Sequence, residues 1–121
     1  MILVDTSVWI DHLRDGRSDL ASLLDRGEVL MHPFIVGELA CGNLSARDAT
    51  IELLEQLRAI TVADHVEVMA FIERQRLHGC GVCYIDVHLL ASAAIDGVRL
   101  WTKDRRLRTL ANKLDLAAPH D

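Results

Sequence analysis

Short apolar runs recur along the chain and alternate with longer stretches of helical periodicity. The runs have the length and the aliphatic content of buried strands, and they lie at residues 2–4, 29–31, 60–63 and 98–101, with a weaker one at 114–117. Strands that alternate with helices favour a parallel sheet with right-handed crossovers and helices on both faces. The expected fold class is therefore α/β, a three-layer α/β/α sandwich around a central parallel sheet of about five strands.

Glycines and capping residues mark the expected helix boundaries. Helix starts are indicated by Pro33, which suits a first helical position, and by capping-box spacing in Ser45 with Asp48 and in Asp64 with Glu67. Five glycines follow helix-compatible stretches and can adopt the left-handed cap conformation: Gly16, Gly27, Gly42, Gly79 and Gly97.

The length of 121 residues and a hydrophobic content of 50% predict one domain over residues 1–121. At this size folding buries about two thirds of the surface of the unfolded chain. The apolar start runs into Asp5 without a basic segment, and no stretch approaches the roughly 18 apolar residues of a membrane span, which predicts a cytoplasmic protein. Three cysteines in such a chain do not indicate a disulfide framework.

The formal charge of −5 weighs against a nucleic-acid partner, because most domains that bind nucleic acids carry a basic surface. A bound metal would offset the negative charge of the acids that hold it, so these acids would not weaken nucleic-acid binding. Positive charge is also concentrated late in the chain, at Arg99, Lys103, Arg105, Arg106, Arg108 and Lys113. Net charge therefore leaves nucleic-acid binding open.

Four acids stand in apolar surroundings in four separate blocks of the chain. Asp5 ends the first apolar run, Asp104 follows the fourth, and Glu38 lies in an early helix. Asp86 falls in the first turn of residues 84–95, which are apolar on nearly every side and predict a buried helix. Ligands of open α/β sheets bind beyond the carboxyl ends of the strands, and buried carboxylates need a cation nearby. We interpret the acids as a site for a divalent metal such as Mg²⁺, which takes oxygen ligands.

The order and spacing of these blocks resemble the PIN-domain nucleases, and within them the VapC-type toxins of bacterial toxin–antitoxin pairs. The resemblance covers essentially the whole chain. It rests on residues 4–11 (VDTSVWID), 37–39 (GEL), 86–93 (DVHLLASA) and 102–104 (TKD). The chain departs from a common family pattern after the last block, where Arg106 and Leu107 replace a further acid and a Phe.

The resemblance implies a parallel α/β/α sandwich, hydrolysis of RNA that depends on Mg²⁺ or Mn²⁺, a homodimer, and inhibition by a cognate VapB-type antitoxin. The catalytic and metal-binding acids of the family carry over onto Asp5, Glu38, Asp86 and Asp104. Neighbouring side chains are candidates for positioning water or substrate, namely the hydroxyls of Thr6, Ser7 and Thr102 and the cations of Lys103, Arg105 and Arg106.

Each of these residues also has a simpler interpretation. The acids could be helix caps, dipole partners or exposed helix residues, and the hydroxyls could be caps. Cys80 and Cys83, with His78 and His88 nearby, have the spacing of half a zinc site, but a second ligand pair is not evident. The remaining histidines lack partners in the sequence, so surface or packing roles are expected for them.

Two other functions remain open from the sequence. A metal-dependent phosphatase or phosphoacceptor domain of receiver type has this length and a comparable strand order. It would need adjacent acids after the first strand, where this chain has Thr6 and Ser7, and a phosphoacceptor after the third, where Asp64 is a poor candidate. A non-catalytic PIN-like binding module would keep the fold without the chemistry, but all four acids are present.

Overall fold

Three short parallel strands form the sheet in the computed structural model, which describes residues 1–16 and 18–120. They are β1 (Ile2–Val4), β2 (Val29–Leu30) and β3 (Arg99–Trp101), in the order β2-β1-β3. Ile2 lies opposite both Val29 and Arg99, and Val4 lies opposite Trp101. The first strand of the chain is therefore the central one, and its two partners come from distant parts of the sequence.

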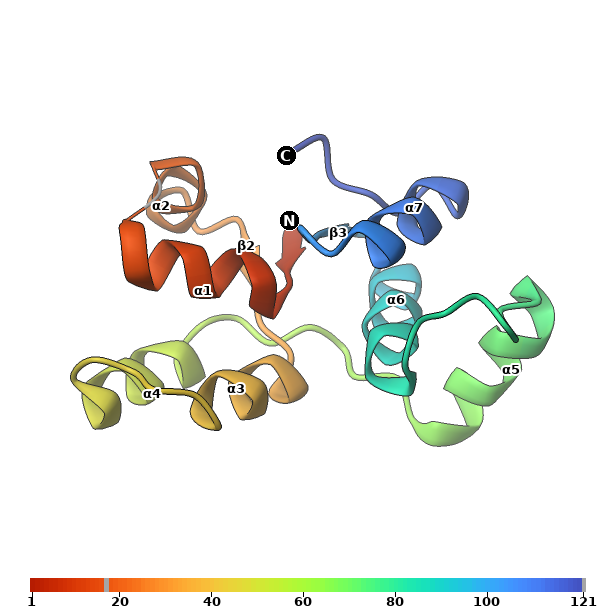
Figure 1. Ribbon diagram of the computed structural model, residues 1–121, viewed down its shortest axis with the longest axis horizontal. Coiled ribbons are helices and arrows are strands. Elements are labelled where there is room, and N and C mark those ends of the chain that lie inside the picture. The colour runs from red at the N-terminus through yellow and green to blue at the C-terminus, as the bar shows by residue number, and fades with distance from the viewer. Residues whose placement is uncertain (17, 121) are drawn as a thin grey trace.

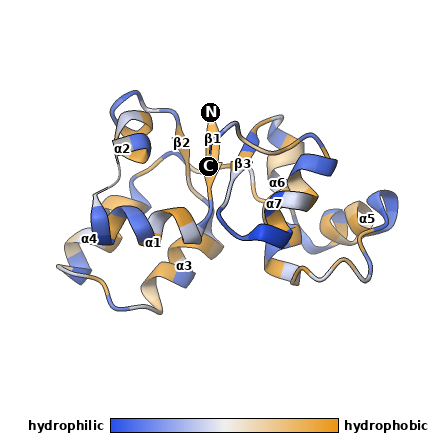
Figure 2. Cartoon of the chain, turned by 45° about the horizontal axis from the view of Figure 1, so that its top comes forward, coloured by the Kyte–Doolittle hydropathy of each residue, from blue (hydrophilic) through white to orange (hydrophobic). Residues whose placement is uncertain are grey.

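Helices cover the sheet on both sides, and Figures 1 and 2 agree on how they divide. On one side lie α1 (Thr6–Asp15), α2 (Ser18–Asp25), α3 (Pro33–Ala40) and α4 (Arg47–Glu55). On the other side lie α5 (His65–Gln75), α6 (Tyr84–Asp96) and α7 (Arg105–Lys113). The strands are in the hydrophobic colour between the two groups in Figure 2. This arrangement confirms the predicted three-layer α/β/α sandwich. None of the described helices is long and apolar enough to cross a membrane.

The prediction of about five strands is wrong, because the described residues form three. In place of the strands expected at 60–63 and 114–117, the described residues form two isolated parallel bridges, Met31 with Ala59 and Leu100 with Ala117.

Side chains of α6 explain why residues 60–63 do not form a strand. The backbone N–H of Thr61 donates to a carboxylate oxygen of Asp96 at 2.9 Å, and that of Ala63 donates to the hydroxyl of Ser92 at 3.1 Å. These donors are satisfied by a helix rather than by a neighbouring strand, so the run packs without extending the sheet.

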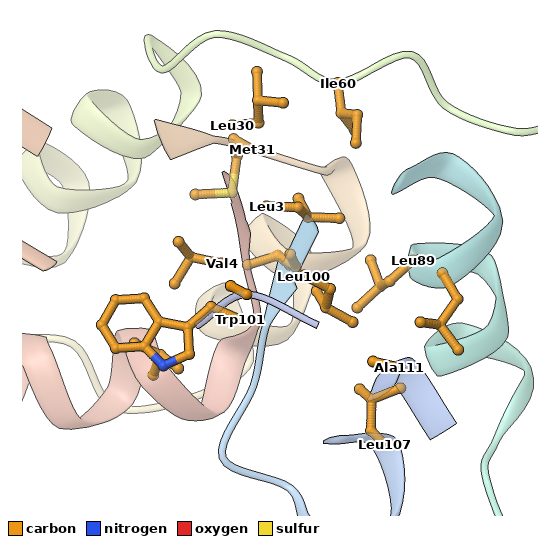
Figure 3. Packing of buried hydrophobic residues seen from close by; sticks show 14 of the residues in the cluster. Leu3, Val4, Leu30, Met31, Ile60, Leu89, Leu100, Trp101, Leu107 and Ala111 are labelled. Atoms are coloured by element: carbon orange, nitrogen blue, oxygen red, sulfur yellow. The ribbon is translucent and has the colours of Figure 1, made fainter. Parts of the chain in front are cut away.

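Side chains alternate across the central strands and supply both halves of the core (Figure 3). Leu3 and Leu100 lie toward Leu89 of α6 and Leu107 of α7, whereas Val4 and Trp101 point to the opposite side. All six are at most 2% exposed. The apolar runs recognised in the sequence are therefore the centre of the molecule, and α6 is the buried helix that was predicted.

Two of the three predicted helix starts are confirmed. Pro33 is the first residue of α3, and Asp64 forms a capping box with Glu67 at the start of α5. The predicted box of Ser45 with Asp48 is wrong, because the chain enters α4 through Ala46 in the left-handed conformation (φ 47°) without a side-chain cap.

Candidate metal and active site

Asp5 lies at the carboxyl end of the central strand and is held by hydroxyl groups. Its side chain is 7% exposed. Its Oδ2 accepts two hydrogen bonds, from Thr102 Oγ1 at 2.7 Å and from Ser7 Oγ at 3.1 Å. Thr102 follows β3 directly and is itself buried. The ends of β1 and β3 are therefore joined through one buried carboxylate.

Asp104 is tied to the same network through its backbone. Its N–H donates to Thr102 Oγ1 at 3.1 Å, and its carboxylate caps α7 by accepting from the N–H of Leu107 at 3.0 Å. The N–H of Lys103 donates to Ser7 Oγ at 3.0 Å. The hydroxyls of Thr102 and Ser7 thus fix the segment that carries Asp104 against the segment that carries Asp5.

Asp86 faces these two acids from the first turn of α6. The N–H of Cys83, at the N-cap, donates to its carboxylate at 3.5 Å. Burial raises the pKa of Asp86, and the negative charges of Asp5 and Asp104 raise it further, whereas the contacts with Cys83 lower it. Three acids from three separate elements therefore share one electrostatic environment.

Glu38 joins the cluster from α3 and is more exposed. Its carboxylate accepts a hydrogen bond from Thr6 Oγ1 at 2.9 Å, and Thr6 is the first residue of α1 directly after Asp5. Glu38 also lines an open cavity of about 450 Å³, shared with Ile10 and Leu13 of α1. All four predicted acids are thus connected: Asp5 and Asp104 through hydroxyls, Asp86 through charge, and Glu38 through Thr6.

The donor chemistry of the cluster fits a hard divalent cation. It offers carboxylate and hydroxyl oxygens, and the mutual repulsion of its acids is relieved by positive charge. Within residues 1–16 and 18–120, no three His, Cys, Asp or Glu side chains are close enough to hold a metal ion as they stand. Magnesium usually keeps several waters, so a shell completed partly through water suits this spacing.

The three predicted cations differ in their surroundings. Lys103 Nζ forms an ion pair with Asp11 of α1, and both side chains are partly buried. Arg106 donates to the carbonyl of Gly81 at 3.5 Å, and Arg105 is exposed at the first position of α7. Asp11 is the residue that sequence reasoning missed. It ends the block 4–11, but its partner lies 92 positions away, so no local pattern reveals the pair.

A second polar cluster lies further along α6 and consists of aromatic rings. His32, the N-cap of α3, is fully buried, and its Nδ1 accepts from the N–H of Phe34 at 3.0 Å. The ring of His88 lies 5.2 Å from it, and that of Tyr84 lies 5.7 Å beyond. Burial, together with the nearby His88, lowers the pKa of His32 to about 4, so the ring is neutral at pH 7.

Cys80 and Cys83 are exposed free thiols in the loop before α6. His88 was considered beside them as a half zinc site, but its side chain packs against His32 and Phe34 in the interior. Cys83 contributes to the acid cluster only through its contacts with Asp86.

Comparison with known proteins places this chain in a family. The family model for the PIN domain matches residues 2–113. Proteins named Ribonuclease VapC32, from two strains of Mycobacterium tuberculosis (CDC 1551 / Oshkosh and ATCC 25618 / H37Rv), are each 46% identical over 109 residues, which cover 89% of this chain and 88% of theirs.

Two solved structures share the fold. The crystal structure of PAE2754 from Pyrobaculum aerophilum superposes with a TM-score of 0.61 at 17% identity, covering 94% of each chain. A structure of FitAB bound to an IR36 DNA fragment gives a TM-score of 0.62 at 22% identity, covering 97% of this chain and 92% of that one. With the family match over most of its length and a relative at 46% identity, this chain belongs to the PIN domain family.

Proposed function

We propose that this protein is a metal-dependent endoribonuclease that acts as the toxin of a toxin–antitoxin pair. The observation that carries the proposal is the gathering of Asp5, Asp86 and Asp104 from three elements into one environment, in which burial raises the pKa of Asp86 and the charges of Asp5 and Asp104 raise it further. Relatives that are 46% identical are named ribonucleases, which supports RNA as the substrate.

Each acid has a role in this proposal. Asp5 and Asp86 would hold Mg²⁺, or Mn²⁺ in its place, directly, and Glu38 and Asp104 would complete the shell directly or through water. One of the latter two orients the water that attacks phosphorus. When bound, the ion supplies charge neutralisation at the phosphate and lowers the pKa of the attacking water. Thr102 and Ser7 hold Asp5 and the Asp104 segment in place through hydrogen bonds.

Phosphodiester hydrolysis of this kind needs no side-chain nucleophile. The chain provides position and charge, so activity depends on carboxylates that are ionised and correctly oriented. The hydroxyls serve this purpose because each fixes one lone pair of a carboxylate and leaves the others free. Thr6 does the same for Glu38.

The proposed partners are a cognate VapB-type antitoxin and a second copy of this chain in a homodimer. A cluster of carboxylates is a ready acceptor for a guanidinium, whose planar fork binds carboxylates bidentately. An antitoxin that inserts an Arg or Lys among Asp5, Glu38, Asp86 and Asp104 would inhibit by displacing the metal.

The alternative of a phosphoacceptor domain finds little support in the contacts. Asp64, the acid after the third apolar run, is occupied as the N-cap of α5, where it accepts from Glu67 N at 2.8 Å. Asp5 is followed by Thr6 and Ser7 rather than by a second acid.

RNA cleavage by the purified protein tests the proposal. We expect cleavage of labelled single-stranded RNA with Mg²⁺, none in excess EDTA, and no release of phosphate from a small phosphoester. Asp5→Asn keeps the size of the side chain but removes a ligand charge, so kcat/KM should fall by at least about 100-fold. Asp48→Asn, which changes an exposed acid of α4, is the matched control and should cleave normally.

Three outcomes would overturn the proposal. Full activity of Asp5→Asn or in EDTA would exclude the metal site. Turnover of the small phosphoester alone would favour a phosphatase, and absence of any cleavage by folded protein would favour a binding module. Co-expression with the adjacent small gene product should yield an inactive complex, and an undiminished cleavage rate of that complex would exclude antitoxin inhibition.

A further inference from the structure

A second pocket lies beside the first turn of α7, one residue beyond Asp104. It has a volume of about 340 Å³ and is lined by Cys80, Arg105, Arg106, Thr109, Leu110 and Lys113. We propose that this pocket and the cations along α7 bind backbone phosphates of the RNA that flank the cleaved bond. The inference rests on the proposed nuclease function and extends it to phosphates that are not cleaved.

The placement of the two arginines goes against helix electrostatics. Arg105 and Arg106 are the first two residues of α7, and the first turn of this helix contains no acid. A cation at a helix N-terminus opposes the helix dipole and is therefore unfavourable. The carboxylate of Asp104 at the N-cap offsets part of this cost, but the same carboxylate is a candidate metal ligand. Residues that break a local rule without full compensation are characteristic of functional sites.

The cations of the pocket are available for an anion. In the part of the chain that the structure describes, Arg105 and Lys113 have no ion pair and no side-chain hydrogen bond. Arg106 makes one long contact, 3.5 Å from its NH1 to the carbonyl of Gly81, which leaves its other N–H groups free. By contrast, Lys103 is held by Asp11. The positive charge next to the acids is therefore on α7.

The spacing of the cations suits a strand rather than a single anion. One face of α7 carries a row of three residues at intervals of four positions: Arg105, Thr109 and Lys113. The distance from Arg105 to Lys113 is about 12 Å along the helix axis. A stacked strand advances about 3.4 Å per nucleotide, so the row spans roughly three nucleotides. An RNA strand that passes Asp104 would continue along this row.

The chemistry of the row predicts binding without sequence preference. Guanidinium forks and an ammonium group contact phosphate oxygens, which are the same at every nucleotide. Leu110, the one aliphatic residue of the wall, is buried. The row therefore fixes the register and orientation of the RNA, whereas the acid cluster performs the cleavage.

Salt-dependent RNA binding tests the row directly. Affinity of labelled single-stranded RNA is measured by anisotropy in EDTA, which stops cleavage. Arg105→Ala/Lys113→Ala should bind about tenfold more weakly at low salt, and its slope of log K against log salt should be shallower by about 1.4, the value for two phosphate contacts of a single strand. Arg26→Ala/Arg47→Ala removes the same charge from the α2 and α4 side of the sheet and should match the wild type.

A length series locates the row along the substrate. RNAs shortened one nucleotide at a time on one side of the cleavage site should show a rising KM with an unchanged kcat over about three nucleotides. Shortening the other side should have a smaller effect. In Arg105→Ala/Lys113→Ala the difference between the two sides should disappear.

Cys80 offers a test of charge at constant size. In a Cys41→Ser/Cys83→Ser background the exposed Cys80 is the single thiol left to modify. Iodoacetate adds a negative group to it, and iodoacetamide adds a neutral group of the same size. The carboxymethyl form should bind RNA more weakly than the carboxamidomethyl form, and bound RNA should slow both reactions.

The outcomes separate this inference from the proposed function. If the wild type cleaves RNA but Arg105→Ala/Lys113→Ala binds like its control and the two Cys80 adducts bind equally, the row is not a phosphate site. If the double variant loses antitoxin binding and keeps RNA binding, the row belongs to the protein partner. If the wild type cleaves no RNA, the proposed function itself is wrong.

Discussion

Helix α6 carries two polar clusters that are built on opposite principles. Near its start, Asp86 shares an electrostatic environment with Asp5 and Asp104, and burial together with their like charge raises its pKa. One half-turn later, His88 meets His32, and burial lowers the pKa of His32 so that the ring stays neutral. The first cluster consists of acids from separate elements, whereas the second consists of packed rings around a neutral His32.

The difference bears on which cluster would hold the proposed cation. The rings of the second are packed against each other, with centroids 4.6 Å apart for Phe34 and His88. The acids of the first repel each other and are only partly covered, since Asp104 and Glu38 are exposed. A cation would relieve the repulsion in the first cluster, whereas the second carries no negative charge to be neutralised.

Replacing Asp86 by Asn should have the largest effect and acts on the first cluster. RNA cleavage should fall by about 100-fold or more, because a ligand charge is lost. The free energy of unfolding in EDTA at pH 7 should increase. Because the pKa of Asp86 is raised, its contribution to stability is fully present below the unfolded value of 3.8 and is lost as pH rises through the folded pKa. Asn does not titrate, so the variant does not lose this stability as pH rises.

Asp96→Asn is the matched control on the same helix. A hydrogen bond from the N–H of Thr61 lowers the pKa of Asp96, so ionisation of this residue favours the folded state. Its replacement should reduce stability at pH 7 and leave cleavage intact. Urea unfolding in EDTA between pH 4 and 7.5 measures both variants. A less stable Asp86→Asn protein would contradict the raised pKa of Asp86.

Replacing His32 by Asn tests the second cluster through acid stability. The unfolded chain takes up a proton on His32 near pH 6.5 and the folded protein only near pH 4. Wild-type stability should therefore fall by about 3 kcal/mol as pH decreases from 7 to 4, at 1.36 kcal/mol per pKa unit. Asn at this N-cap still accepts from the N–H of Phe34 but does not titrate.

The quantity compared is the dependence of the free energy of unfolding on pH in the wild type and in His32→Asn. Chemical unfolding at several pH values should show a shallower decline for His32→Asn, whatever its stability at pH 7. Parallel profiles would mean that His32 titrates normally and that the ring cluster is open to water.

Replacing Thr102 by Val should have a smaller effect and tests how the acids are held. Val keeps the shape of the buried side chain but removes a donor to Asp5 and an acceptor for the N–H of Asp104. Unsatisfied buried groups cost about 1–3 kcal/mol, and a misplaced Asp5 should lower the rate of cleavage. Thr102→Ser restores the hydroxyl and should recover most of both losses. Equal defects in Val and Ser variants would assign Thr102 to packing.

The sequence was sufficient for the parts of the molecule that follow from local pattern. The strand at residues 2–4 and the buried helix at 84–96 were predictable because apolar length and periodicity alone define them. The proximity of the four acids was predictable because each stands at a recognisable strand end or in a recognisable helix. Even so, their connection through Thr102, Ser7 and Thr6 depends on distances that no spacing encodes.

The remainder depends on tertiary contacts. Residues 60–63 have a strand-like composition, but the side chains of Ser92 and Asp96 satisfy their backbone donors. Lys103 looked like a free cation because its partner Asp11 is 92 positions away. The start of α4 was misplaced because a left-handed Ala46 is not a residue that capping rules favour.

The position of β1 in the middle of the sheet also has a consequence for synthesis. Its pairing with β3 joins residue 2 to residue 99, and the hydrogen bond of Thr102 to Asp5 spans 97 positions. Contacts of such separation form late, because the loop between them must first be closed. A chain that emerges from its N-terminus therefore carries Asp5 from the beginning but cannot complete the acid cluster until about five sixths of it has been made. A nascent or truncated copy would be inert toward the messenger that encodes it.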